Sequence, residues 1–239
     1  MKKLLLILLP ISIFLVSCGG GEDELQPNSI YTYVPDNNFE LKLINMGLDN
    51  ILNDTVLTSA IDTVKYLNLD GDFHSLVGLE SFISIEDFTI STVFNNLNSI
   101  DLSSNLKLKN LNVFMAGGSL KNIDLSNNTK LEGFGIDGCW GINSLDLRQN
   151  INLKSICISY TNITNLDVSN LTDLESLCCN RNQLLSLNIK NGNNSNMSYF
   201  NCLNNNQLYC IEVDDVNYAN LNFTNIPSQS FFSEDCGVK

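Results

Sequence analysis

The segment Leu97–Val113, with the sequence LNSIDLSSNLKLKNLNV, contains one short apolar pattern twice and decides how the chain folds. In each copy an aliphatic residue is followed by two others, three and five positions later: Leu97, Ile100 and Leu102, then Leu108, Leu111 and Val113. Two apolar residues separated by one position point to the same side of an extended chain. The segment therefore predicts two short strands, each with one apolar face.

The same double pattern recurs along the chain at nearly constant spacing. Its copies begin at Leu97, Leu120, Ile142, Ile163, Leu184 and Leu208, which are 23, 22, 21, 21 and 24 residues apart. A less regular unit precedes them, with Val64–Leu69 as its first half and Gly78–Phe82 as its second half. Such spacings are typical of leucine-rich repeats, in which one coil cannot bury its apolar edge alone and neighbouring coils must stack. We therefore predict a mainly β solenoid over residues 64–213, with two short strands in each coil.

Three asparagines occupy the same place after the first apolar triplet of successive units: Asn105, Asn128 and Asn150. A side-chain amide at a turn can hydrogen-bond the backbone groups that the turn leaves without partners. We interpret these residues as part of the scaffold and assign them no chemistry.

The nested pattern L-x-x-L-x-L-x-x-N, in units of about 21 residues, resembles the bacterial leucine-rich repeat proteins that are common on the surfaces of Bacteroidetes. The resemblance extends over nearly the whole mature chain, from the segment Val34–Glu40 to the closing segment Cys210–Gly237. Many such proteins end in a C-terminal sorting domain, whereas this sequence ends three residues after Cys236. We therefore expect attachment through the N-terminus.

The N-terminus has the pattern of a lipoprotein signal peptide over residues 1–17. Two lysines precede the apolar run Leu4–Val16, which is shorter than the roughly 20 residues that a membrane span requires. The tetrapeptide Leu-Val-Ser-Cys that ends at Cys18 resembles a bacterial lipobox. This resemblance implies that Cys18 becomes the acylated first residue, carrying palmitate or a similar chain, and anchors the protein without a transmembrane helix.

Residues 18–30 are predicted to form a flexible acidic tether, because Gly19–Gly21 and Glu22–Glu24 offer no apolar side chain for folding. In Bacteroidetes an acidic run behind the lipidated cysteine resembles the signal that directs lipoproteins to the outer face of the outer membrane. We therefore expect a surface-exposed outer-membrane lipoprotein. An orientation toward the periplasm is the alternative.

Both ends of the solenoid are predicted to be capped, since a terminal repeat has no neighbour. Over residues 31–63, Asp36 offers an N-cap for a short helix that places Phe39, Leu43 and Met46 on one side, and Gly47 offers a stop. Over residues 214–239 we predict a C-terminal cap that a disulfide between Cys210 and Cys236 fastens. Its expected apolar residues are Tyr218, Leu221, Phe223, Phe231 and Phe232.

The remaining cysteines do not form a recognisable metal site. Cys178 and Cys179 are neighbours in a strand and face opposite sides, so they cannot both reach one ion together with Cys202. Cys179 and Cys202 lie in the register of buried aliphatic residues and are interpreted as small core groups. Cys157 and Cys178 point outward from successive coils, and their pairing, like that of Cys139, stays open.

Composition and motifs argue against several functions. The chain has 26 acidic and 13 basic residues and a net charge of −13, which becomes −15 when Lys2 and Lys3 leave with the signal peptide, so nucleic acid would be repelled. The only histidine, His74, is interpreted as a turn residue. The sequence contains no zinc-protease motif, phosphate loop, dinucleotide motif or nucleophile elbow, so we expect neither catalysis nor a cofactor.

Two outward-facing groups of side chains are candidate binding surfaces. The first is a carboxylate row on the first strands: Asp101, Asp124, Asp146 and Asp167. Such a row requires a basic partner, Ca²⁺ or simple solvation to offset its repulsion, and a straight row suits Ca²⁺ poorly. The second group is aromatic and lies on or beside the second strands: Phe114, Trp140, Tyr160 and Tyr199. Exposed aromatic rings among small polar residues are typical of protein or glycan binding.

The sequence therefore predicts a lipid-anchored leucine-rich repeat protein at the cell surface that binds a protein, with a glycan as the less favoured ligand, in adhesion or host interaction. The alternative is an accessory lipoprotein that organises an envelope complex from the periplasmic side. The oligomeric state is not predicted.

Overall fold

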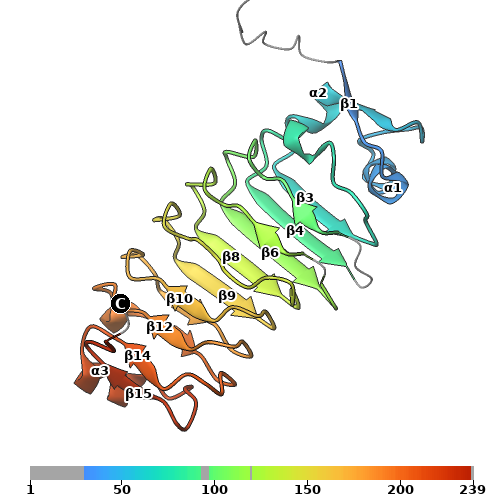
Figure 1. The fold of residues 1–239 in the computed structure, drawn as a ribbon. Coiled ribbons are helices and arrows are strands. Elements are labelled where there is room, and N and C mark those ends of the chain that lie inside the picture. The colour runs from blue at the N-terminus through green and yellow to red at the C-terminus, as the bar shows by residue number, and fades with distance from the viewer. Residues whose placement is uncertain (1–29, 93–96, 119, 238–239) are drawn as a thin grey trace, which may run out of the picture.

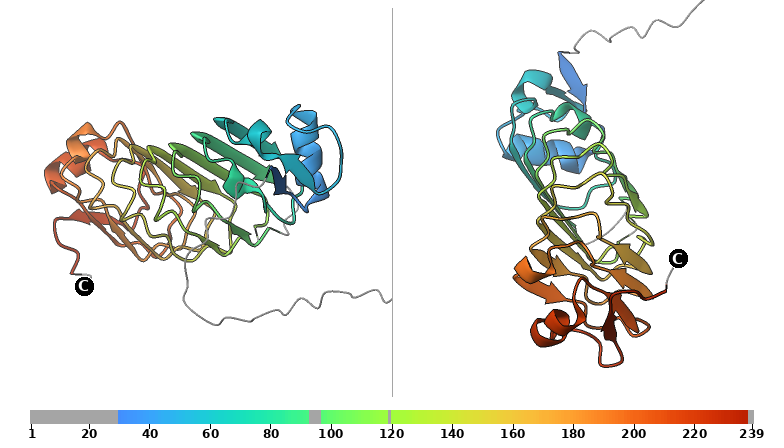
Figure 2. Two further views of the ribbon diagram at one scale, coloured as in Figure 1. Left: turned by 90° about the horizontal axis from the view of Figure 1, so that it is seen from above. Right: turned by 90° about the vertical axis from the view of Figure 1, so that its left-hand side faces the viewer.

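A computed structural model describes residues 30–92, 97–118 and 120–237 of the chain. The chain winds into an elongated stack of coils that runs from an N-terminal cap to a C-terminal cap (Figure 1). The two caps lie at opposite ends of the stack in every view (Figure 2). The predicted signal peptide, the lipidation site Cys18 and all but the last residue of the predicted tether lie outside the described residues.

One side of the stack is a parallel seven-stranded sheet, which we call the main sheet. Its strands follow one another along the chain and along the sheet at intervals of 21 to 23 residues. They are β3 (Tyr66–Asp70), β4 (Asp87–Thr92), β6 (Asn110–Met115), β8 (Gly133–Asp137), β9 (Ser155–Ser159), β11 (Ser176–Cys178) and β13 (Tyr199–Asn201). Each of the last five is the second strand of a predicted coil, so the solenoid prediction is confirmed.

The other side of the stack carries the shorter first strands in two separate sheets. β5 (Ser99–Ile100) pairs with β7 (Asn122–Ile123), and β10 (Asn165–Asp167), β12 (Ser186–Asn188), β14 (Cys210–Glu212) and β15 (Phe231–Ser233) pair in that order. In the coil that begins at Ile142 the first segment forms no strand, although Leu147 is buried. The apolar pattern fixes which side chains point inward, whereas a strand also needs pairing of the neighbouring main chains.

The first coil differs from the prediction in where its second half lies. The segment 78–82, which was expected to supply it, contains the short 3₁₀ helix η1 (Leu79–Ser81), and the strand comes later as β4. The apolar pattern of β4, which is Ile85, Phe88 and Ile90, is present in the sequence, and all three residues are buried.

Buried asparagines close the turn between the two sides of the coils, as predicted. Asn128 is fully buried, and its amide Nδ2 donates to the carbonyl oxygens of Leu102 and Asn105, both at 3.1 Å. Asn105 and Asn150 bond the neighbouring coils in the same way. These bonds satisfy carbonyl groups that burial would otherwise leave without a partner. The interpretation of the three asparagines as scaffold is confirmed.

Two further asparagines hydrogen-bond turn carbonyls in the last coils, at the turn that follows the second strand. Asn182 donates to the carbonyl oxygens of Ile158 and Cys179, and Asn205 donates to those of Cys179 and Cys202. Their Oδ1 atoms also accept, from the backbone N–H of Thr161 and Leu184 respectively. This role of Asn182 and Asn205 was not predicted from the sequence.

The N-terminal cap is built from a strand pair and two helices. β1 (Tyr31–Tyr33) pairs antiparallel with β2 (Thr55–Leu57), and these strands are accompanied by α1 (Asn37–Asn45) and α2 (Thr58–Ile61). Asp36 caps α1 as expected, accepting the backbone N–H of Asn38 at 3.0 Å and of Phe39 at 2.9 Å. Met46 was expected on the buried side, but it is the C-cap residue and is 38% exposed, because α1 ends before it completes another turn.

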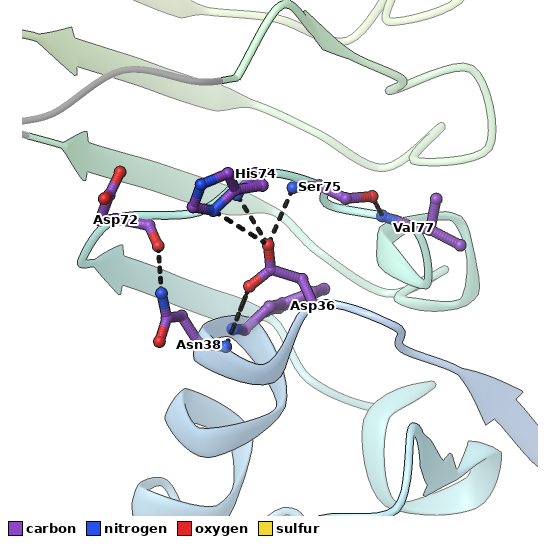
Figure 3. Close-up of polar contacts among 7 residues, drawn as sticks. Asp36, Asn38, Asp72, His74, Ser75 and Val77 are labelled. Atoms are coloured by element: carbon purple, nitrogen blue, oxygen red, sulfur yellow. Dashed lines mark hydrogen bonds and ion pairs between the residues drawn. The ribbon is translucent and has the colours of Figure 1, made fainter.

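The carboxylate of Asp36 also ties α1 to the first coil. Its second oxygen accepts the backbone N–H of His74 at 2.7 Å and of Ser75 at 3.0 Å (Figure 3). Asn38 donates from its side chain to the carbonyl oxygen of Asp72 (Figure 3). On the apolar side the Phe39 ring packs against Phe73 and Phe82, with centroids 6.3 Å away in each case. The helix therefore covers the end of the stack.

The C-terminal cap contains α3 (Val216–Asn222) and the added strand β15. The predicted disulfide between Cys210 and Cys236 is present, with Cα atoms 5.8 Å apart. Phe223 and Phe232 are buried, and the Phe223 ring lies 4.8 Å from that of Phe200 in the last coil of the main sheet. Leu221 and Phe231, two other apolar residues of the predicted cap, are 81% and 58% exposed, because they lie on the outer sides of α3 and β15.

Replacement of Asn128 by alanine should lower the free energy of unfolding by about 2 to 4 kcal/mol, because two buried carbonyl oxygens lose their donor. The exposed neighbour Asn127 provides the matched control, and its replacement by alanine should change stability by less than about 0.5 kcal/mol. Urea unfolding followed by circular dichroism measures both. Equal stabilities of the two variants would contradict the scaffold role.

Candidate binding surface

The outward side chains of the main sheet form three rows that run across the coils. The middle row consists mostly of small or polar residues, because strand positions that alternate with the core face outward. Its members, from β3 to β13, are Asn68, Thr89, Asn112, Gly135, Cys157, Cys178 and Asn201. A surface of this kind presents few bulky obstacles to a docking partner.

Two glycines of β8 keep the middle of this surface low. The side-chain oxygens of Asn110 and Asn112 lie where a Cβ atom on Gly133 or Gly135 would meet them, at 2.6 and 2.5 Å. Any larger residue at either position would push the asparagine of β6 aside. The glycines therefore let the asparagine amides lie flat across the neighbouring strand.

A column of left-handed residues ends the strands on one side of the main sheet. Gly138, Tyr160, Arg181 and Asn204 have φ values of +75°, +52°, +59° and +60° and lie in successive coils. The backbone N–H of Tyr160 donates to the carbonyl of Arg181 at 3.1 Å, and that of Arg181 donates to Leu203 at 2.9 Å. Glycine and asparagine suit this conformation, whereas for tyrosine and arginine it costs about 1 kcal/mol or more.

The two strained residues and Trp140 form an exposed group that we call the aromatic corner. The Trp140 and Tyr160 rings are 6.3 Å apart and inclined by 30°, and the guanidinium carbon of Arg181 lies 4.9 Å from the centre of the Tyr160 ring. The last contact is a cation–π interaction. Trp140 is 56% exposed, so the corner does not serve as core.

The structure brings together only part of the predicted aromatic surface. Trp140 and Tyr160 are in contact, and Phe114 is an exposed residue on β6 whose register partner is Asp137 on β8. Tyr199 is exposed on β13, and its hydroxyl accepts a hydrogen bond from Asn201. It lies apart from the corner, since it begins its strand whereas the corner follows the strand ends.

Arg181 was not among the predicted residues. Its spacing of 21 residues from Tyr160 placed it at the equivalent position of the next coil. Nothing in the sequence indicated that this position adopts a left-handed conformation that turns both side chains toward each other.

The carboxylate row has a local structural role in each coil. Asp101, Asp124, Asp146 and Asp167 each accept the backbone N–H two residues further on, at 2.9, 2.9, 3.1 and 2.9 Å. This is the arrangement of an Asx turn. Arg148 lowers the pKa of Asp146 to about 2 through a side-chain hydrogen bond, and the hydrogen bonds of Ser103 and Ser126 lower those of Asp101 and Asp124.

The row does not gather oxygens around one point. Among the described residues no group of three or more His, Cys, Asp or Glu side chains is arranged to hold a metal ion. Each carboxylate serves its own turn, and Asp146 is further paired with Arg148 at 2.6 Å. The aromatic corner therefore has more features of a binding site than the carboxylate row has.

A row of alternating charges runs along the other edge of the main sheet, and we call it the charge ladder. It occupies the position before each of the first six strands of the main sheet and consists of Lys65, Glu86, Lys109, Glu132, Lys154 and Glu175. Glu86 bridges Lys65 at 2.8 Å and Lys109 at 2.6 Å, and Lys154 pairs with Glu132 at 2.9 Å. The alternation is visible at the repeat spacing in the sequence, but it lies outside the strand positions from which the binding surfaces were predicted.

His74 lies at the junction of the N-terminal cap and the first coil, where its backbone N–H bonds Asp36. It also borders a hollow of about 410 Å³ whose walls include Ser75, Glu80, Leu97 and Asp101.

No helix in the described part of the chain is long and apolar enough to cross a membrane.

Solved structures of similar shape place this architecture among known folds. Internalin C2 from Listeria monocytogenes superposes with a TM-score of 0.55 at 16% identity, covering 86% of this chain and 88% of that one. The leucine-rich repeat domain of the type III effector XopL gives 0.51 at 13% identity, covering 73% and 60%. The fold is that of a leucine-rich repeat protein. No protein-family model and no curated protein matches the sequence.

A third leucine-rich repeat structure, the functional domain of InlJ from Listeria monocytogenes, is 18% identical, with a TM-score of 0.41 and coverage of 77% of this chain. This chain spans 52% of the InlJ chain and 60% of the XopL chain. At such identities the likeness concerns the leucine-rich repeat fold alone.

The charge ladder predicts a specific dependence of stability on pH. The hydrogen bonds and charges of Lys109 and Lys65 lower the pKa of Glu86 in the folded state to about 2, below its usual value of about 4.3 in an unfolded chain. Because the folded pKa is the lower one, Glu86 stabilises the fold above that usual value, and this contribution is lost as the pH falls toward 2.

Replacement of Glu86 by glutamine should therefore lower stability at pH 6, and the difference from the original chain should shrink at pH 3. Urea titrations at both values measure this. The exposed Glu234 of the C-terminal cap provides the control, whose replacement by glutamine should leave the pH dependence unchanged. An equal effect of the two replacements would exclude the ladder as its source.

Proposed function

We propose that this leucine-rich repeat protein is a binding module that docks a protein ligand on the outward face of the main sheet, with the aromatic corner as the anchor. The observation that carries the proposal is the group of contacting side chains Trp140, Tyr160 and Arg181 beyond the ends of successive strands, in which Trp140 and Arg181 are exposed and Tyr160 is half-buried. Tryptophan, tyrosine and arginine are the residue types that most often dominate binding energy at protein interfaces.

The conformations of Tyr160 and Arg181 support this role. Both residues adopt φ values that glycine would adopt without strain, and the equivalent position one coil earlier is Gly138. A strained, bulky residue that covers no core lowers the stability of the isolated chain. Such strain is typically kept where the side chains are needed for binding.

The low surface beside the corner supplies room for a partner. Gly133 and Gly135 keep the centre of the main sheet flat, and polar side chains such as Asn110 and Asn112 offer hydrogen bonds around it. Protein interfaces combine a few aromatic anchors with a polar, hydrogen-bonding surround. A glycan can also stack on aromatic rings, so it is the second ligand class.

We further propose that the module is a lipid-anchored, surface-exposed protein of a bacterial outer membrane, acting in adhesion or host interaction. The sequence Leu15–Cys18 and the acidic tether behind it support an anchor at Cys18. The first described residue, Ile30, follows that cysteine by twelve positions and leads directly into the N-terminal cap. An anchor at this end would leave the main sheet free along its length. We assign no catalytic step to this surface.

The corner can be removed without introducing new strain. We expect the variant with Trp140→Ala, Tyr160→Gly and Arg181→Gly to stay folded, because glycine accepts the left-handed conformation. Its affinity for a ligand found on a panel of purified extracellular host proteins and a glycan array should fall by about 100-fold or more. Surface plasmon resonance measures the affinity.

The control variant carries Leu221→Ala and Phe231→Ala, which remove exposed apolar side chains from the C-terminal cap. It should bind as the original chain does. Unchanged binding by the triple variant would exclude the corner as the anchor, and signals on the glycan array alone would change the ligand class.

The location can be tested on intact cells. Proteinase K should degrade the protein on whole cells while a periplasmic marker survives, and Cys18→Ala should release the protein from the membrane fraction. Immunoblotting of both fractions measures these outcomes. Full protection of the protein in intact cells would favour the periplasm-facing accessory lipoprotein, and retention of the Cys18→Ala variant would exclude the anchor.

A further inference from the structure

Two cysteines lie side by side on the outward face of the main sheet. Cys157 on β9 and Cys178 on β11 are register partners in adjacent parallel strands. Both alternate with buried neighbours: Ile156 and Ile158 beside Cys157, and Leu177 and Cys179 beside Cys178. Paired strands lie about 4.8 Å apart, which falls within the Cα separations that a disulfide can bridge.

Their thiols share one hydrogen-bonded group. A side-chain hydrogen bond joins Cys157 and Cys178, and the Ser159 hydroxyl oxygen lies 3.7 Å from the Cys178 sulfur and 4.0 Å from the Cys157 sulfur. The Cys178 thiol donates to Oδ1 of Asn180 at 2.9 Å, and the Ser159 hydroxyl donates to the same oxygen at 2.8 Å. The backbone N–H of Asn180 also hydrogen-bonds Cys178 and lowers the pKa of its thiol.

The shared hydrogen bond makes the two thiols unequal. It lowers the pKa of Cys178 to about 6 and raises the pKa of Cys157, while the nearby charge of Asp137 on β8 raises both. On the other side β13 presents the neutral Asn201 as the register partner of Cys178. Cys178 is therefore the better nucleophile at neutral pH, and Cys157 keeps its proton.

The remaining described cysteines lack this reactivity. Burial raises the pKa values of Cys139 and Cys202 to about 12 and that of Cys179 well above its usual range. All three are buried, and a buried neutral thiol is a poor nucleophile. Cys210 and Cys236 are already joined to each other.

We propose that Cys157 and Cys178 form a thiol–disulfide exchange site that reacts with small disulfides of the glutathione type. The Cys178 thiolate attacks the disulfide, forms a mixed disulfide and releases one small thiolate. Cys157 then attacks the Cys178 sulfur, its proton passing to solvent or to the leaving sulfur, and the second small thiol departs. The small disulfide is reduced by two electrons, and the two cysteines are oxidised to one disulfide.

The strand geometry makes this bond reversible. Disulfide Cβ atoms lie about 3.8 Å apart, whereas side chains of paired parallel strands keep the strand spacing of about 4.8 Å, so closure draws β9 and β11 together. A disulfide under such strain is reduced more easily than a relaxed one. The site lies in the middle of the main sheet, so it goes beyond the proposed binding function and does not depend on it.

The test equilibrates the folded full-length protein with oxidised and reduced glutathione at several ratios and then blocks free thiols with N-ethylmaleimide in acid. Cleavage after Glu, Lys and Arg places Cys157 in the peptide 155–175 and Cys178 in the peptide 176–181, so mass spectrometry can identify a peptide pair joined by a disulfide, and fragment spectra assign the bond to Cys178 rather than to the adjacent Cys179. We expect the Cys157–Cys178 link to form in oxidised buffer and to disappear at ratios that leave Cys210–Cys236 intact.

Single variants separate the two roles. Cys157→Ser should accumulate glutathione on Cys178, because no second thiol releases it, whereas Cys178→Ser should be modified far more slowly at Cys157. In the original chain at pH 7, Cys178 should react with iodoacetamide at least about ten times faster than Cys139, Cys179 or Cys202. Circular dichroism confirms that each variant is folded.

Three results would overturn the proposal. The first is the absence of the Cys157–Cys178 link at every glutathione ratio in folded protein. The second is a link that persists under conditions that reduce Cys210–Cys236, since it would then be a structural bond. The third is equal glutathione modification of Cys157 and Cys178 in the two single variants, which would remove the division into attacking and resolving thiol.

Discussion

The stack depends on the hydrogen bonds between a buried asparagine amide and two carbonyl oxygens in the turn of the neighbouring coil. Each coil reverses its direction within a few residues, and the reversal places backbone carbonyls inside the apolar interior where water cannot reach them. The amide of Asn128 bonds the carbonyls of Leu102 and Asn105, which lie at the two ends of the neighbouring coil's turn, and the bond repeats with the next asparagine. Aliphatic side chains can then fill the interior without leaving these carbonyl groups unpaired.

The two ends of the stack are covered in different ways. At the N-terminal end the Asp36 carboxylate accepts four backbone N–H groups, two from α1 and two from the first coil. At the C-terminal end Phe223 and Phe232 cover the last coil, and a disulfide closes the segment around them. Polar capping suits a helix N-terminus, whose N–H groups lack partners, whereas the other end exposes mainly apolar side chains.

The outward face of the main sheet has different local properties along its length. Its two edges carry paired charges and strained aromatic residues, and its centre carries glycines and two thiols. The charged side chains, the aromatic corner and the two thiols lie outside the apolar interior, so filling of the core does not fix their identities. A surface on which Tyr160 and Arg181 are kept in strained conformations, and on which Cys178 lies within a hydrogen-bonded group, indicates demands other than folding.

The sequence by itself determined the coil period, the inward faces of the strands, the buried asparagines and the pairing of Cys210 with Cys236. Apolar spacing reports directly which side chains point inward, and a repeated interval shows that coils stack. It did not reveal that the coil at Ile142 lacks its first strand, or that Met46 and Phe231 are exposed, because these depend on where a helix ends and on which main chains pair.

Only the tertiary structure decided how outward residues meet. Trp140, Tyr160 and Arg181 come together because their turns adopt one left-handed conformation in successive coils, which no local periodicity encodes for residues other than glycine. Alignment of the repeats could place Cys157 beside Cys178, but the direction of their hydrogen bond depends on Ser159, Asn180 and the neighbouring strands. Sequence patterns fix the buried face because burial restricts residue type. Exposed contacts follow from backbone conformation and register across distant positions.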